Sequence, residues 1–243
     1  MKFKRIIKKL IRKIISERAA NQFFWNPPFN YVQNITINNI CEYAQVAEKD
    51  IKRWAIVGVY LGNEIPQILR KYSYVTIDAF ECSKRYTNRL NKRFRKNKRV
   101  NIVNKAVSSY DGESIFYETN LNGNGSLLQL DELSWENYKS RPKEKFPVKS
   151  ITLDTFYKNQ SIDILWIDVQ GAEKLVIDGA KKTLIKVKAI FIEVSITDGF
   201  YKNSVKMDEI YKILREFGFS LVLLGTDFNL TGNALFVKKE KEK

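Results

Sequence analysis

Apolar and polar positions divide the chain into an amphipathic amino-terminal segment and a longer region in which strand and helix patterns alternate. In residues 1–18, apolar residues recur at helical spacing and cations occupy most of the other positions. Charges interrupt this pattern too often for a membrane span, which needs about 20 consecutive apolar residues. Two prolines at residues 27–28 end the predicted helix and mark a linker. The apolar stripe consists of Phe3, Ile6, Ile7, Leu10, Ile11, Ile14 and Ile15.

The rest of the chain predicts an α/β fold. Strands that alternate with helices form right-handed βαβ crossovers, so we expect a Rossmann-like, mostly parallel seven-stranded sheet with helices on both faces. A sheet of this kind binds its ligand at the carboxyl ends of its strands. Short apolar runs predict the strands, at residues 54–60, 74–80, 100–107, 162–167, 189–194, 220–224 and 234–238. Amphipathic stretches predict the helices, at residues 34–52, 64–72, 83–96, 173–186 and 207–217.

The pattern predicts one domain at residues 31–238, after the helix and linker of residues 1–30 and before a charged tail at 239–243. Residues 110–150 interrupt the alternation with turn sequences and a single short strand at 114–117. Long irregular segments inside compact domains usually carry function. We therefore expect an insertion that covers the ligand site.

Composition excludes several classes of enzyme. The 243 residues are 44% hydrophobic, enough for one sizeable core, and contain no histidine. Ser-His-Asp hydrolases, Cys-His proteases and zinc deaminases are therefore excluded. The two cysteines, Cys41 and Cys82, lack metal-ligand spacing, and we expect both to be small buried residues in a reducing compartment. No metal site is predicted.

The net charge of +15 is concentrated at the amino terminus. Residues 1–18 contribute +7, and the remaining 225 residues contribute a dispersed, lysine-rich +8. Dispersed charge of this kind is weak evidence for nucleic acid, so we expect no nucleic-acid partner. A basic amphipathic helix is typical of peripheral contact with an anionic membrane. Docking on its own domain or on a partner chain is the alternative.

Two features at successive strand ends indicate a nucleoside cofactor. Gly58 and Gly62 lie where the first predicted strand meets the next helix, and a missing side chain there lets a ligand approach the backbone. A tight turn is the alternative explanation. Glu81 follows the second strand, where an acid accepts hydrogen bonds from ribose hydroxyls. The glycine spacing matches neither the dinucleotide pattern nor a phosphate-binding loop, which favours S-adenosylmethionine.

The most specific stretch is residues 163–173, which read Asp-Ile-Leu-Trp-Ile-Asp-Val-Gln-Gly-Ala-Glu, followed by Gly179-Ala180. This block resembles the D-x-L-x-I-D-x-Q-G-x-E…L-x-G-A signature of FkbM-like methyltransferases, and the resemblance runs from residue 54 to 237. It implies an S-adenosylmethionine-dependent O-methyltransferase that acts on a hydroxyl of a saccharide or glycolipid in bacterial surface polysaccharide biosynthesis, with the insertion touching this acceptor. Further matches, in the family's order, are Phe80-Glu81, Asn104 to Ser108, Ser126-Leu127, Ile151 to Asp154, Ile192 to Val194, Gly218-Phe219 and Gly232 to Phe236.

The first motif departs from the family pattern. Many members have Asp-x-Gly-Ala-Asn-x-Gly, whereas residues 56–62 read Ile-Val-Gly-Val-Tyr-Leu-Gly, and Cys82 replaces the usual Pro. Asn63 and Glu64 are candidates to replace the missing acid and amide at the methionine end of the cofactor. A catalytically weak or inactive homologue remains an alternative. The predicted cofactor residues are Gly58, Tyr60, Gly62, Asn63, Glu64, Glu81, Asn104, Ala106 and Asp168.

Methyl transfer to a hydroxyl needs a base, and without histidine a carboxylate or a metal-bound acceptor must serve. Asp168 and Glu193 end neighbouring predicted strands and are the candidates for base and orienting group, with Gln170 orienting the acceptor. For Asp168, capping of the helix that begins near Ala172 is the alternative. Glu173 is expected to be a favourable charge in the first turn of that helix rather than catalytic.

Two rival functions remain open. A nucleic-acid methyltransferase would suit the net charge, and residues 26–29 spell the Asn-Pro-Pro-Phe motif of amino methyltransferases, but far upstream of the fourth strand. A non-catalytic, methyltransferase-like scaffold in a glycan-synthesising complex is the second rival. We favour a cytoplasmic enzyme that contacts the inner membrane face through its amino-terminal helix.

Overall fold

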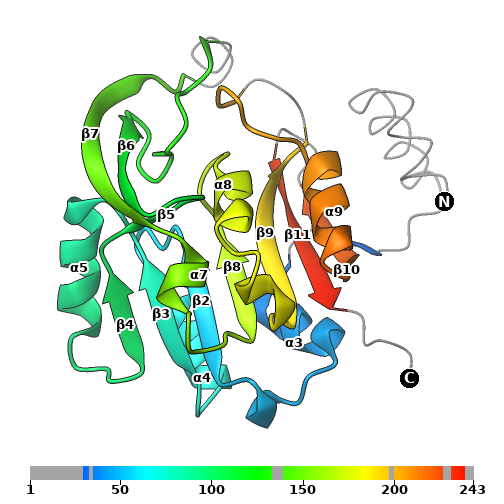
Figure 1. Cartoon of the computed structure of the whole chain (residues 1–243). Helices are drawn as coiled ribbons and strands as arrows, with labels where there is room; N and C mark the ends of the chain where they lie inside the picture. The colour runs from blue at the N-terminus through cyan, green and yellow to red at the C-terminus, as the bar shows by residue number, and fades with distance from the viewer. Residues whose placement is uncertain (1–29, 33–34, 133–138, 197–199, 227–230, 239–243) are drawn as a thin grey trace.

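The computed structural model describes residues 30–32, 35–132, 139–196, 200–226 and 231–238. Eight strands form the main sheet in the order β1-β10-β11-β9-β8-β2-β3-β4 (Figure 1). Only β11 runs antiparallel to its neighbours within this sheet. The seven predicted strands are all present, and β1 adds an edge strand that the sequence pattern missed. The strands are β1 Asn30–Val32, β2 Arg53–Val57, β3 Thr76–Phe80, β4 Val100–Val103, β8 Ile164–Ile167, β9 Ala189–Ser195, β10 Phe219–Thr226 and β11 Thr231–Lys238.

Helices cover both faces of the sheet, as expected. Along β2, Trp54 and Ile56 belong to one hydrophobic cluster, and Ala55 and Val57 belong to the other, because successive side chains of a strand point to opposite faces. The first cluster also holds apolar residues of α3 (Ile37–Ala44), α4 (Ile65–Lys71) and α5 (Lys84–Phe94). The second holds those of α7 (Leu153–Phe156), α8 (Glu173–Asp178) and α9 (Met207–Glu216).

The register of the parallel strands brings the candidate site together. Val57 of β2 pairs with Phe80 of β3 on one side and with Ile167 of β8 on the other. Phe80 pairs with Val103 of β4, and Ile167 pairs with Ile192 of β9. The residue after each of these lies one step further along, so the carboxyl ends of β2, β3, β4 and β8 meet at one edge, beside Glu193 of β9.

A second sheet has the order β5-β7-β6, formed by β5 (Ala106–Val107), β6 (Gly112–Thr119) and β7 (Pro142–Ile151). The strand predicted at residues 100–107 is therefore wrong in its second half. After β4 the chain turns, with the Lys105 amide donating to the Val103 carbonyl at 3.0 Å, and β5 pairs with β7 instead. The predicted insertion contains a long antiparallel hairpin rather than one short strand (Figure 1).

Two predicted helices are shorter in the structure. The helix expected at residues 34–52 ends at Ala44 and is followed by a short 3-10 turn, and α8 ends at Asp178. A side chain at Gly179 would overlap the Ser108 carbonyl oxygen, so the chain after α8 packs directly on the backbone that follows β5. The predicted amino-terminal helix, its linker and the charged tail lie outside the described residues.

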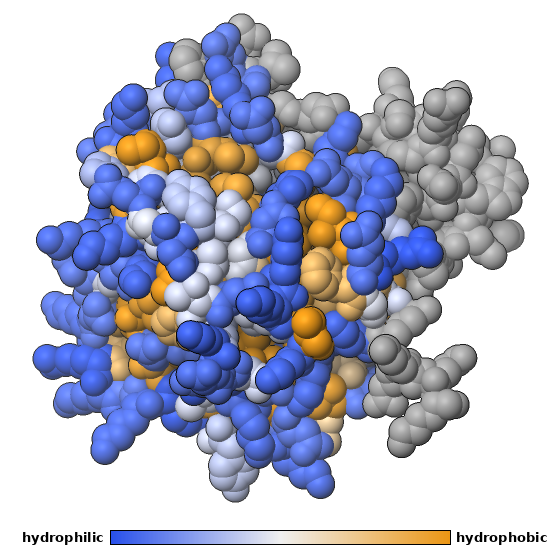
Figure 2. Space-filling model, in the orientation of Figure 1, coloured by the Kyte–Doolittle hydropathy of each residue, from blue (hydrophilic) through white to orange (hydrophobic). Residues whose placement is uncertain are grey.

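None of the described helices is long and apolar enough to cross a membrane. Hydrophilic residues cover the side of the molecule formed by α5 and β4 (Figure 2). Residues 84–99, which contain α5 and the turn after it, include nine Lys or Arg and no acidic residue. This side of the molecule is therefore strongly basic.

Candidate active site

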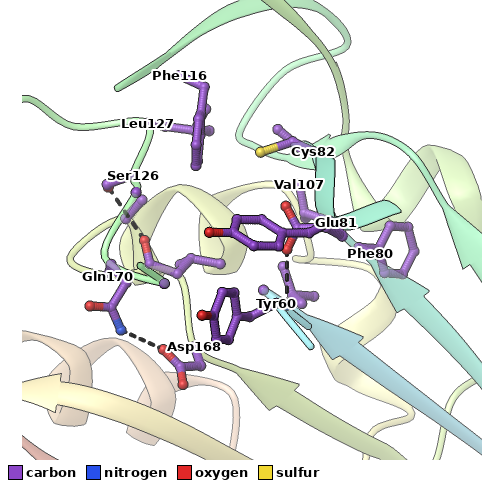
Figure 3. Close-up of a pocket in the computed structure, with 18 of the residues that line it drawn as sticks. Tyr60, Phe80, Glu81, Cys82, Val107, Phe116, Ser126, Leu127, Asp168 and Gln170 are labelled. Atoms are coloured by element: carbon purple, nitrogen blue, oxygen red, sulfur yellow. Dashed lines mark hydrogen bonds between the residues drawn. The ribbon is translucent and has the colours of Figure 1, made fainter. Parts of the chain in front are cut away.

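A cavity lies at the carboxyl ends of β2, β3 and β8, beneath the segment that follows β6. The insertion therefore covers this cavity, as the sequence pattern predicts. Figure 3 shows Glu81 and Tyr60 on one side of the cavity, Asp168 and Gln170 on another, and Phe116 and Leu127 across from them. The predicted site residues that line it are Gly58, Tyr60, Glu81, Ala106, Asp168 and Gln170.

Gly58 is fixed by the close approach of two strand ends. Its φ is +87°, and a Cβ there would overlap the Asp168 carbonyl oxygen, so only glycine fits. Its amide donates to the Phe80 carbonyl at 3.0 Å. The two explanations for Gly58, a tight turn and a ligand site, are therefore compatible, because this turn brings backbone groups to the cavity.

Glu81 is buried, and two backbone amides hold its carboxylate in place. The Tyr60 amide donates to its Oε2 at 2.9 Å (Figure 3), and the Ser83 amide donates to its Oε1 at 2.7 Å. Burial raises the pKa of Glu81 to about 7, although these amide hydrogen bonds lower it. The carboxylate has further lone pairs for donors in the cavity.

Asp168, Gln170 and Glu193 form a connected group. The Gln170 amide nitrogen donates to Asp168 Oδ1 at 2.7 Å and to Glu193 Oε2 at 2.8 Å. Gln170 has a φ of +55°, a left-handed conformation that turns its side chain back toward both carboxylates. Burial raises the pKa of Asp168, and burial together with the Asp168 charge raises the pKa of Glu193 well above its ordinary value. The pair therefore holds a proton at a pH where isolated carboxyls have lost theirs.

Two expectations for this region are corrected. Glu193 lies within β9 rather than at its end, because pairing of Glu193 with Asn233 of β11 continues the strand beyond its last pair with β8. Glu193 does not line the cavity. It accepts a hydrogen bond from Gln170, which does line the cavity. Ala172 caps α8 without a side-chain hydrogen bond, which decides against the alternative that Asp168 caps this helix.

Glu173 begins α8 as expected, but it is not a simple favourable charge. It is 3% exposed, and burial raises its pKa to about 7. Its Oε1 accepts the Gly171 amide at 3.0 Å. Its charge therefore costs free energy in the folded protein, and its hydrogen bond supports the turn that carries Gln170.

Four predicted cofactor residues do not line the cavity. A Cβ at Gly62 would be 2.9 Å from Leu90, so this glycine allows α5 to pack closely. Asn63 accepts a hydrogen bond from Arg93 at 3.1 Å, and Glu64 precedes α4, where burial raises its pKa to about 7. The Asn104 amide donates to the Glu81 and Cys82 carbonyls at 2.9 and 3.1 Å, which holds the turn after β3.

Several lining residues were not singled out from the sequence. Tyr86 of α5 packs edge-on against Tyr60, with ring centroids 4.7 Å apart. Phe116 and Glu118 belong to β6. No motif in the sequence around them indicated that they belong to a site. Cys82 is only half-buried and lines the cavity, so the expectation that it is simply a buried apolar residue is wrong.

Comparison with known proteins identifies this arrangement. Residues 57–221 match the methyltransferase FkbM domain. The chain belongs to this family. Membership confirms the Rossmann-like fold, the assignment as an enzyme and S-adenosylmethionine as the methyl donor. The 2-O-methyltransferase NoeI of Sinorhizobium fredii (strain NBRC 101917 / NGR234) is 27% identical over 175 residues, which cover 66% of this chain and 70% of that protein. Together, the family and this relative support methyl transfer to oxygen.

Solved structures align with the FkbM methyltransferase at low identity. An O-methyltransferase family protein from Burkholderia thailandensis is 10% identical with a TM-score of 0.46, over 84% of this chain and 56% of that one. The fibrillarin pre-rRNA processing protein of Methanococcus jannaschii is 14% identical with a TM-score of 0.47, over 81% of this chain and 70% of that one.

The cavity residues suit the cofactor in their chemistry. Glu81 offers oriented acceptors for ribose hydroxyls, and Gly58 lines the cavity, with the Asp168 carbonyl filling the place that a Cβ would take. The free volume is about 70 Å³, less than the roughly 300 Å³ or more of small-molecule sites. Tyr60, whose ring lies against Gly123, is one of the side chains that bound this space.

Proposed function

We propose that this FkbM methyltransferase transfers a methyl group to a hydroxyl of a saccharide in bacterial surface polysaccharide or glycolipid biosynthesis. The observation that carries the proposal is the pair of buried carboxylates joined by the Gln170 amide beside the candidate cofactor site. Such a pair can accept the proton that a hydroxyl must lose. The relative NoeI is a 2-O-methyltransferase, which supports oxygen as the acceptor atom.

In this proposal Asp168 is the base, Glu193 tunes its proton affinity, and Gln170 orients both. When bound, S-adenosylmethionine supplies an electrophilic methyl group on a sulfonium. As the methyl group passes to the acceptor oxygen, Asp168 would take the proton of that hydroxyl, and the hydrogen bonds from Gln170 would keep both carboxylates in place. A raised pKa makes Asp168 a stronger base than an exposed aspartate.

The test is methyl transfer from labelled S-adenosylmethionine to panels of saccharides, RNA and DNA by the purified full chain. We expect label in saccharides alone. Label in nucleic acid, with affinity that falls steeply as salt rises, would establish the rival nucleic-acid methyltransferase instead. Calorimetry with S-adenosylmethionine addresses the second rival, because a non-catalytic scaffold that has lost the cofactor gives no heat of binding.

We also propose that residues 1–18 make peripheral contact with an anionic membrane. The sequence supports this through its apolar stripe and its charge of +7. The basic side of the molecule at α5 adds a further attraction to acidic head groups. Such contact would place a cytoplasmic enzyme near a lipid-linked acceptor at the inner membrane face.

A further inference from the structure

A second cavity of about 390 Å³ lies beside the first, at the outer end of the β6–β7 hairpin. Residues 128–132 and 201–202 form its other walls. Its volume is within the range of about 300–1,000 Å³ of small-molecule sites. Figure 1 shows the segment before α9 at the same end of the molecule as the hairpin.

Backbone pairing holds the walls of this cavity in place. Tyr117 of β6 exchanges two hydrogen bonds with Ser126, at 2.8 and 3.1 Å. Leu130 forms an antiparallel bridge with Tyr201, and the Lys202 amide donates to the Gln129 carbonyl at 2.8 Å. The cavity is therefore part of the folded structure rather than a gap between loose loops.

Two residues connect the second cavity to the candidate active site. Glu118 lines both cavities. Tyr201 lines the second, its ring packs on Gly171 beside Gln170, and its hydroxyl donates to the Asn124 carbonyl at 2.8 Å. Glu118 is therefore a wall that the two cavities share, which places the second cavity next to the candidate active site.

Two of the three lysines that line the second cavity pair with glutamates, which bears on the class of ligand. Three lysines and three glutamates line it. Lys143 lies 2.9 Å from Glu118 and 3.5 Å from Glu144, and Lys202 lies 3.6 Å from Glu132. Burial is the largest single influence on the pKa of Glu118 and raises it, but the hydrogen bonds with Lys143 and Glu144 and the nearby positive charges together hold this pKa below its ordinary value. Paired charges offer alternating donors and acceptors to hydroxyls and little net attraction to a polyanion.

We propose that the second cavity binds the sugar residues that flank the methylated one in an oligosaccharide acceptor. Glu118 lies at the junction, where it accepts hydrogen bonds from the sugar hydroxyls. This inference rests on the proposed function, since it assumes a saccharide acceptor. It goes further by requiring an acceptor longer than one sugar.

The test measures binding and methyl transfer separately. The binding probes are maltohexaose, mannohexaose and xylohexaose with their monosaccharides, titrated into the full chain in the presence of S-adenosylhomocysteine. We expect at least one hexasaccharide to bind about tenfold more tightly than its monosaccharide. Equal affinity of each pair, or no binding of any hexasaccharide, would overturn the proposal. If the chain binds a hexasaccharide in this way but methylates no saccharide, the proposal for the second cavity stands and the proposed function is wrong.

Variants of exposed lysines locate the binding. Lys145→Ala combined with Lys202→Ala should reduce hexasaccharide affinity about tenfold, because both residues line the cavity. Lys149→Ala is the matched control, since Lys149 is exposed on the same strand, β7, but lies outside the cavity. Unchanged affinity in the double variant, or an equal loss in the control, would contradict the proposal.

Glu118→Gln provides a second, isosteric variant, with folding checked by circular dichroism. We expect about fivefold weaker hexasaccharide binding, because the amide is a poorer acceptor than the carboxylate. A single-stranded DNA oligonucleotide serves as the polyanion probe. If it competes with the hexasaccharide and its own binding weakens in the double lysine variant, the cavity binds nucleic acid and the saccharide proposal is wrong.

Discussion

Five acidic residues near the carboxyl ends of β2, β3, β8 and β9 share burial but differ in their partners. Burial raises the pKa of Glu64, Glu81 and Glu173 to about 7 in each case, and raises the pKa of Asp168 and Glu193 as well. Backbone amides hold Glu81 and Glu173, whereas the Gln170 amide joins Asp168 to Glu193. At the residue scale, these partners, rather than residue type, distinguish the carboxylates to which we assign proposed binding and catalytic roles from the structural one.

Glu81→Ala should weaken S-adenosylmethionine binding by about 1.5–3 kcal/mol, the range for losing hydrogen bonds to a charged group. The physical reason is the loss of an oriented carboxylate that accepts ribose hydroxyls. Calorimetry on the folded variant measures the effect, and Glu113→Ala, at an exposed position of β6, is the control. Wild-type affinity in Glu81→Ala would rule out the ribose role.

Asp168→Asn should lower turnover by about 100-fold or more, because the amide cannot accept the acceptor proton. The variant keeps an oxygen for the hydrogen bond from Gln170, so fold and cofactor affinity should change little. Single-turnover methyl transfer and calorimetry measure the two effects, with the exposed Asp50→Asn as control. If turnover remains near the wild-type value, Asp168 is a structural residue.

Glu173→Gln should stabilise the protein at pH 8 and leave its stability at pH 5 nearly unchanged. Because the folded pKa of Glu173 is raised from 4.5 to about 7, the fold favours the protonated form, and stability is lost as pH rises through this window. The shift corresponds to about 3 kcal/mol at most. Urea unfolding at both pH values tests this, and an identical pH dependence of variant and wild type would contradict it.

At the scale of elements, the turn from β2 into α4 depends on one glycine. Gly58→Ala should destabilise the protein by about 4 kcal/mol or more, because the methyl group overlaps the Asp168 carbonyl oxygen and φ is +87°. Gly112→Ala is the control: its φ is also positive, but its Cβ would meet nothing closer than 3.9 Å. Denaturant unfolding compares the two, and equal losses would show that backbone strain alone matters.

The apolar pattern and the length of each strand explain which strand predictions succeeded. Strands with a continuous apolar run, such as residues 164–167, were predicted because burial on both faces leaves a clear signature. The split between β4 and β5 was not predicted, because residues 100–107 are apolar enough for a single strand. The two strands are distinguished only by their pairing, since β4 pairs with β3 and β5 pairs with β7. The three-residue strand β1 is too short to leave a pattern.

For the whole molecule, deletion of residues 1–20 should release the protein from anionic vesicles without unfolding the catalytic domain. Each Lys or Arg near an anionic surface contributes about 1 kcal/mol, and the apolar stripe adds burial, so binding should weaken with salt without being abolished. Vesicle sedimentation of full-length and truncated chains measures this. Full-length protein in the supernatant at low salt, or an insoluble truncation, would show that the helix packs on protein instead.

The sequence by itself determined the sheet, the order of its strands and helices along the chain, and the family. The alternating apolar runs and the motif at residues 163–173 each involve residues that are close in the chain, and a sequence pattern can reveal features of this kind. It also predicted that Asp168 and Glu193 are neighbours, because residues after parallel strands meet at one edge.

Only the tertiary structure decided which predicted residues line the cavity and which support it. Gly62 follows the family pattern as closely as Gly58 does, yet only Gly58 lines the cavity, and Gly62 lets α5 pack closely. The second cavity and the shared position of Glu118 depend on a hairpin folding back over the sheet edge. Contacts between segments far apart in the chain are set by packing and register, which no local pattern contains.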